Sequence, residues 1–135
     1  MNLSKNLNLL MMTYSYKINN TTKAIIVDIN GEMYPTDFAK LDVEVCTLAL
    51  NLNYKIIFNF KKAIVRICLG EAYFWFSNHL DNINLQFRFI PTAHIANDSN
   101  ESFFHFVETT WSNQGVKIKM FKNEDEALNW LEQFT

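Results

Sequence analysis

The alternation of hydrophobic and polar residues predicts two strands near the start of the chain. Residues 12–18 alternate hydrophobic with polar side chains, which is the period-two pattern of a half-exposed strand. The polar residues 19–22 predict a turn, and residues 23–30 form a β-branched segment that is typical of a second strand. We therefore expect the two segments to pair as an antiparallel hairpin, with Gly31 ending the second strand.

Helices and strands alternate along the rest of the chain. Four helices are predicted from N-terminal signals and from hydrophobic residues spaced three and four apart, starting near residues 35, 70, 98 and 123. Three more strands are predicted, at residues 55–60, 86–96 and 116–121. Pro91 interrupts the middle one of these strands, which predicts either a bulge or a late start at Thr92.

This order, β-β-α-β-α-β-α-β-α, predicts an α/β fold. Strands that alternate with helices favour right-handed crossovers and a largely parallel sheet with helices packed on it. We expect a single domain with a five-stranded, mostly parallel mixed sheet and four helices, in which the N-terminal strand is antiparallel to its neighbour. Residues 1–11 have no clear period and are expected to form a lead-in segment, with residues 12–135 forming the domain.

The ends of the last two helices carry specific expectations. Asp98 and Glu101 have the spacing of a capping box, and Gly115 stands where a helix C-terminal glycine is expected. The final helix is expected to bury Trp130 and Leu131. If the indole ring of Trp130 is fully buried, its replacement by alanine costs about 3–5 kcal/mol.

Composition and charge narrow the class of protein. Of the 135 residues, 49% are hydrophobic and 19% are charged, so the chain has the composition of a globular domain. The net charge of −2, without a basic stripe, excludes a typical nucleic-acid binder. Neither a secretory signal nor an apolar run of about 20 residues is present, which predicts a cytoplasmic protein without a membrane span. Cys46 and Cys68 lie among apolar residues and are expected to be buried thiols.

The closing segment carries a resemblance to a known family. Residues 115–131 read Gly-Val-Lys-Ile-Lys-Met-Phe-Lys-Asn-Glu-Asp-Glu-Ala-Leu-Asn-Trp-Leu. This segment, together with the element order over residues 12–135, resembles the STAS domain (sulfate transporter and anti-sigma factor antagonist), especially its small bacterial SpoIIAA-like relatives. The resemblance implies a STAS-like fold and a regulatory or protein-interaction module that is not an enzyme.

The resemblance also implies where a phosphorylation switch would lie. Anti-sigma antagonists of this family carry a phosphorylatable serine in a turn after the middle strand, at the start of a helix. Aligning residues 56–60 with that strand places Ile67-Cys68-Leu69-Gly70 on the turn. Leu69 fills the position of the serine and has no hydroxyl to accept a phosphoryl group, so we expect the switch to be absent.

Few residues are candidates for catalysis or for binding a metal, cofactor or ligand. The three glycines are far apart, which excludes a glycine-rich phosphate loop. His105 and Glu108 share a helix face, but two ligands do not make a metal site, and we expect no metal and no cofactor. His94 lies late in a strand with Asp98 nearby, where open α/β sheets bind ligands. The two residues are therefore a possible polar site, against the alternatives of a histidine hydrogen-bonded inside the sheet and a helix cap.

The aromatic segment Tyr73-Phe74-Trp75-Phe76 is the strongest candidate for a contact surface. Successive helical residues lie about 100° apart, so if Tyr73 and Phe76 face the sheet, Phe74 and Trp75 cannot. Three alternatives would bury these rings: neighbouring helices, a homodimer or protein partner, or a small apolar ligand. The leading hypothesis is a dimeric STAS-like interaction module with Phe74 or Trp75 in its interface, and the alternative is a binder of a lipid or other small apolar ligand.

Overall fold

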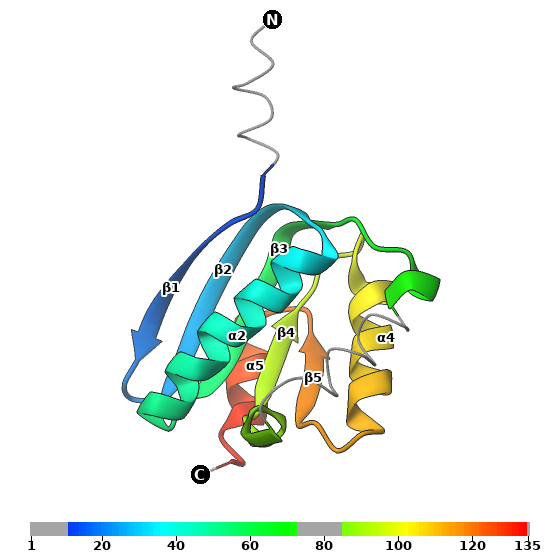
Figure 1. The fold of residues 1–135 in the computed structure, drawn as a ribbon. Helices are drawn as coiled ribbons and strands as arrows, with labels where there is room; N and C mark the ends of the chain where they lie inside the picture. Colours follow the sequence, from blue (N-terminus) through cyan, green and yellow to red (C-terminus); the bar gives the residue numbers. More distant parts are fainter. Residues whose placement is uncertain (1–10, 73–84, 135) are drawn as a thin grey trace, which may run out of the picture.

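A five-stranded mixed sheet forms the centre of the molecule. The structure is a computed structural model that describes residues 11–72 and 85–134, drawn in Figure 1. The strands are β1 (Thr13–Asn19), β2 (Ala24–Met33), β3 (Lys55–Val65), β4 (Thr92–Ile95) and β5 (Ile118–Phe121). They lie side by side in the order β1-β2-β3-β4-β5. β1 is antiparallel to β2, and the other neighbours are parallel, which confirms the predicted sheet.

Helices follow the predicted alternation. The described helices are α2 (Pro35–Leu52), α4 (Glu101–Ser112), α5 (Glu124–Leu131) and the short 3-10 helix η1 (Leu85–Phe89). Residues 69–72 are helical, where a helix is predicted to start near residue 70, and the rest of the predicted segment lies outside the described residues. At the start of α2, the Asp37 carboxylate accepts a hydrogen bond from the Tyr34 backbone N–H at 2.8 Å, which satisfies one of the free amides at a helix N-terminus.

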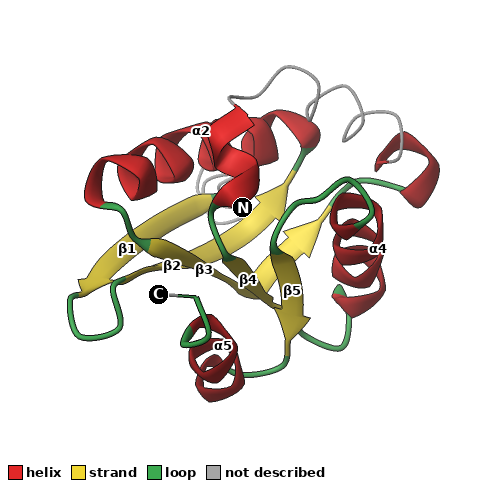
Figure 2. Cartoon of the chain, turned by 90° about the horizontal axis from the view of Figure 1, so that it is seen from below, coloured by secondary structure: helices red, strands yellow, loops and turns green. Residues whose placement is uncertain are grey.

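The sheet separates two hydrophobic cores. α2 and α4 cover one face and α5 covers the other, as Figure 2 shows. Because side chains alternate along a strand, Ile56, Phe58 and Phe60 of β3 join the core under α2 and α4, whereas Ile57 joins the core under α5. β3 is therefore buried on both faces over residues 56–58, as its short run of hydrophobic residues predicts.

β2 and β3 are both longer than predicted. β2 continues through Gly31 to Met33, so the expectation that Gly31 ends the strand is wrong. The pairing of β2 with β3 shifts between Asp28 and Asn30, and Gly31 adopts a φ of 94°. A glycine tolerates this backbone conformation without the steric cost of a side chain, so the strand passes through the irregularity and continues.

The residues before β4 do not form the predicted strand, but β4 begins at Thr92, which is one of the two predicted alternatives. Residues 85–89 form η1, so the expected strand over residues 86–96 is shorter than predicted. β4 begins at Thr92, directly after Pro91, as the missing N–H of proline requires.

The two ends of α4 bear out one prediction and correct another. Asn100 is the N-cap of α4, so Asp98 lies outside the helix start and the predicted capping box is wrong. Gly115 has a φ of 86°. Its N–H donates to Ser112 O, and the N–H of Val116 donates to Trp111 O, both at 3.1 Å. This pair of bonds closes a helix through a C-terminal glycine, which confirms the role of Gly115.

Two burial expectations are corrected. In α5, Leu131 is buried, but Trp130 is only half-buried beside Phe121 and Phe134, because the helix turns Leu131 rather than Trp130 toward the sheet. Cys46 is buried and Cys68 is exposed, both as free thiols. Burial raises the pKa of the Cys46 thiol. Within residues 11–72 and 85–134, none of the helices combines the length and hydrophobicity needed to cross a membrane.

Candidate functional site

β3 extends past the end of its neighbour β4. β4 pairs with β3 only over Ile56–Asn59, whereas β3 continues beside β2 as far as Val65. On the β4 side, the backbone of β3 beyond Asn59 therefore has no strand partner among the described residues. Buried backbone carbonyls require hydrogen-bond donors, so another part of the chain must supply them.

Two asparagines of the loop between β4 and α4 supply these donors. The side-chain amide of Asn97 donates to Lys61 O at 2.7 Å, and that of Asn100 donates to Phe60 O at 3.0 Å and Ala63 O at 3.2 Å. The two residues also hold each other, because each side-chain oxygen accepts a hydrogen bond from the backbone N–H of the other. The loop is thereby fixed against the extended end of β3.

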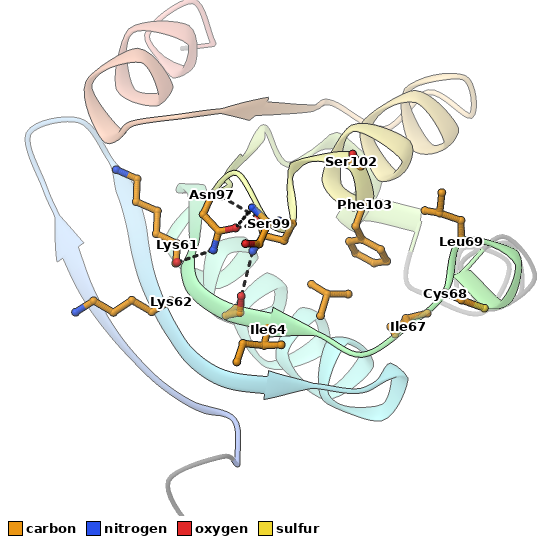
Figure 3. Close-up of a pocket in the computed structure, with 13 residues that line it drawn as sticks. Lys61, Lys62, Ile64, Ile67, Cys68, Leu69, Asn97, Ser99, Ser102 and Phe103 are labelled. Atoms are coloured by element: carbon orange, nitrogen blue, oxygen red, sulfur yellow. Dashed lines mark hydrogen bonds between the residues drawn. The ribbon is translucent and has the colours of Figure 1, made fainter.

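A hollow of about 580 Å³ lies beside this junction. Figure 3 shows it between the end of β3, the segment that follows β3, and the start of α4. Phe103 and Ile67 are its large buried apolar residues, whereas Ile64 and Leu69 are 45% and 49% exposed. The other lining residues are Lys61, Lys62, Ala63, Val65, Cys68, Asn97, Ser99, Asn100 and Ser102.

The polar groups of the hollow lie around its apolar part. The side chains of Lys61 and Lys62 extend away from Phe103 and Ile67 (Figure 3). Cys68, at the start of the next helix, donates through its Sγ to Glu71 Oε1 at 2.9 Å. The arrangement presents apolar side chains to solvent at the carboxyl ends of β3 and β4, the end of a parallel sheet at which α/β proteins bind ligands and partners.

His94 is enclosed by aromatic rings. The imidazole contacts Phe58, Phe60 and Phe104 edge-on, at centroid distances of 5.8, 5.2 and 5.4 Å. Its Nδ1 atom is buried without a hydrogen-bond partner, and desolvation lowers the pKa of His94 from 6.5 to about 3. The imidazole is therefore neutral near pH 7 and does not line the hollow.

The shifted pKa of His94 makes stability depend on pH. Below pH 6.5 the unfolded chain gains a proton at this histidine that the folded chain excludes until about pH 3. The free energy of unfolding therefore decreases as the pH is lowered across this window. At 1.36 kcal/mol per pH unit, the loss reaches about 2 kcal/mol at pH 5. Urea unfolding at pH 7 and pH 5 measures the loss, which His94→Leu should abolish.

The control for this measurement is His105→Gln. The side chain of His105 is 70% exposed, so this variant replaces a histidine outside the core and should retain the loss of stability that is assigned to His94. An equal pH dependence in the parent protein and in His94→Leu would contradict the assignment to His94.

Asp98 has different surroundings from His94. Its carboxylate is fully exposed and accepts a hydrogen bond from Lys122 Nζ at 2.9 Å, and Lys122 also pairs with Glu101. The neighbouring Lys122 ammonium lowers the pKa of Asp98. The structure thus gives His94 and Asp98 separate partners, one in the core and one on the surface, so a joint polar site for the two residues has no support from the geometry.

His105 and Glu108 are neighbours on the surface of α4. His105 Nδ1 lies 3.7 Å from Glu108 Oε2, which makes a surface pair. Across the described parts of the chain, no three side chains of the metal-binding types gather into a possible site. Phe74 and Trp75 lie outside the described residues.

The hollow and its two asparagines were not identified from the sequence. Neither Asn97 nor Asn100 was assigned a role from the sequence, although their spacing of three, directly after a strand, is a usable signal for a side-chain-capped loop. No local sequence pattern indicates that β3 continues past the end of β4. The hollow therefore follows from the sheet register alone.

Structural comparison identifies the fold. A crystal structure of an anti-sigma factor antagonist from Mycobacterium paratuberculosis matches with a TM-score of 0.59 at 9% sequence identity, covering 90% of this chain and 94% of the other. An uncharacterised protein with a SpoIIAA-like fold from Shewanella loihica PV-4 matches with a TM-score of 0.54 at 13% identity, covering 89% and 93%. The sequence itself matches neither a protein-family model nor a curated protein.

The two matches agree with the observed sheet. Each covers nearly the whole of both chains, so the likeness extends over almost the entire chain rather than over one segment. At these identities the likeness concerns the fold. The chain, with its one antiparallel strand pair and its otherwise parallel sheet, therefore has the STAS-like, SpoIIAA-like α/β fold.

Proposed function

We propose that this chain is a non-enzymatic, cytoplasmic regulatory module that binds a protein partner at the hollow between β3 and α4. The observation that carries the proposal is the pair of exposed apolar side chains, Ile64 and Leu69, beside the buried Phe103. Apolar side chains gathered in a concave surface favour association, because contact removes them from water. The anti-sigma factor antagonist with the same fold is named for an action on another protein, which supports the same class of function here.

The module works without a phosphorylated serine at the turn after β3. Residues 67–70, which lead from the segment after β3 into the next helix, are Ile-Cys-Leu-Gly, and Leu69 contributes an exposed hydrocarbon side chain to the hollow. A phosphoserine at this position would add about two negative charges beside the apolar side chains. Leucine instead keeps the surface apolar, so partner binding at this site depends on contact rather than on a charge switch at residue 69.

Two matched variants test the proposal. Leu69→Glu places a carboxylate at the hollow, and Val43→Glu places one on α2 at a residue of similar exposure, 46% against 49%. A partner is first isolated with the parent protein from the cells that produce it, identified, and purified separately. Calorimetry should then show that Leu69→Glu weakens binding at least about tenfold, whereas Val43→Glu leaves the Kd unchanged. Equal affinities of both variants would contradict the proposal.

Binding of a lipid or another small apolar ligand is the second candidate function. The volume of about 580 Å³ lies within the range of about 300–1,000 Å³ that is usual for small-molecule sites. Native mass spectrometry of the protein purified from its own cells separates the two functions. A retained small molecule that is lost in Leu69→Glu supports the ligand, and a retained protein supports the partner.

A further inference from the structure

β1 is an edge strand with one open side. It lies at the end of the sheet and pairs with β2 in unbroken register over all seven of its residues. Within the described residues, no strand pairs with its other side. The backbone N–H and C=O groups on that side are therefore available to a further strand. β1 contains neither a proline nor a bulge, two of the features that usually block such pairing.

The two faces of β1 differ in chemistry. Tyr14, Tyr16 and Ile18 lie opposite Ile29, Val27 and Ile25 of β2, so they share the sheet face that α2 covers. Tyr16 and Ile18 are 53% and 41% exposed. The other face of β1 carries Thr13, Ser15, Lys17 and Asn19. β1 thus presents an apolar row and a polar row, one on each side of the sheet.

We propose that β1 pairs antiparallel with β1 of a second copy of this chain, about a two-fold axis through Tyr16. An axis perpendicular to the sheet keeps the face covered by α2 on the same side in both copies, so the apolar rows meet. The register sets Tyr16 opposite Tyr16 and Tyr14 opposite Ile18, as aromatic and aromatic–β-branched cross-strand pairs. The interface is isologous and closed, so the assembly stops at a dimer.

The charges of β1 select this register. With the axis at Tyr16, Lys17 of each copy lies opposite Ser15, and no ammonium group faces another. An axis at Lys17 would place the two ammonium groups directly opposite, which is unfavourable. An axis at Ser15 would leave Ile18 and Asn19 beyond the paired part of the strand. The central register also pairs all seven residues of β1.

The dimer leaves the proposed partner site open in each copy. No residue of β1 lines the hollow beside β3 and α4. The inference concerns a separate surface from the one in the proposed function, and neither depends on the other. A dimer would nevertheless present two hollows to a partner that carries two binding segments, which raises the apparent affinity through effective concentration.

Light scattering on purified protein tests the interface. The parent protein should have about twice its chain mass of 15.9 kDa. Tyr16→Glu sets two carboxylates opposite each other at the axis and should lower the mass to that of one chain. The control Phe89→Glu changes another exposed aromatic residue, 66% exposed and three strands away from β1, before β4, and should keep the dimer. Circular dichroism confirms that both variants are folded.

Cysteine crosslinking tests the register independently of charge. Opposite residues of an antiparallel pair have Cα atoms about 4.5–5.5 Å apart, a distance that permits a disulfide. In a Cys68→Ser background, Tyr16→Cys should form a crosslinked dimer under mild oxidation. Ser15→Cys should not, because the offset separates its two copies by about 8 Å. A monomeric parent protein, a dimeric Tyr16→Glu, or equal crosslinking of both cysteines would overturn the proposal.

Discussion

Phe104→Ala is expected to lower the free energy of unfolding by about 3–5 kcal/mol. Phe104 is 0% exposed, and its ring stacks on Phe60 with the centroids 4.3 Å apart. The rings of Phe103 and His94 contact it edge-on. Because these neighbours belong to α4 and to the central strands, they cannot easily move to fill the cavity, which places the cost in the upper part of the range for buried side chains.

The matched control for Phe104 is Phe89→Ala. Phe89 is 66% exposed, so its truncation should change stability by no more than about 0.5 kcal/mol. Urea unfolding curves of the parent protein and both variants give the comparison. Similar midpoints for Phe104→Ala and the parent protein would show that the aromatic cluster is not the centre of the core.

Leu131→Ala is expected to cost about 2–5 kcal/mol, and more than Trp130→Ala. Leu131 is 1% exposed and lies in the core between α5 and the sheet with Ala127. The end of the helix is also held by Lys55, whose Nζ donates to Leu131 O at 3.2 Å and Phe134 O at 2.9 Å. These backbone acceptors survive the substitution, so the measured loss reports the packing of the leucine side chain.

Trp130 is the internal comparison for this prediction. Its half-buried ring packs at the side of α5 against Phe121 and Phe134, so its truncation leaves a site that water can enter rather than a closed cavity. Thermal unfolding of Leu131→Ala and Trp130→Ala ranks the two. A larger loss for Trp130→Ala would contradict the orientation of α5 on the sheet.

The prediction of a largely parallel sheet depended on signals that act within a few residues. Pro91 lacks an N–H and therefore limits where β4 can begin, whatever surrounds it. Gly115 ends α4 because its positive φ is open to glycine at low cost. The continuous apolar run of β3 indicates burial on both faces. Such effects are local, so the sequence pattern carries them directly.

The candidate site depended on non-local relations that a sequence pattern does not contain. The hollow exists because β3 continues beyond the residues that pair with β4, and the end of one strand relative to another is a property of register. The roles of Asn97 and Asn100 follow from the carbonyls that this extension leaves to be satisfied. Only the assembled sheet identifies those carbonyls.

His94 and Trp130, whose surroundings differ from what the sequence predicts, illustrate the same distinction between local and non-local effects. A strand pattern gives the side to which His94 points, but the three rings around it come from two other elements, β3 and α4. Helical spacing places Trp130 and Leu131 side by side, and only the contact of α5 with the sheet decides which one is buried. The sequence alone determined the order and type of most elements, because their signals are local. The tertiary structure decided the site and the burial of individual side chains, because both depend on which distant segments meet.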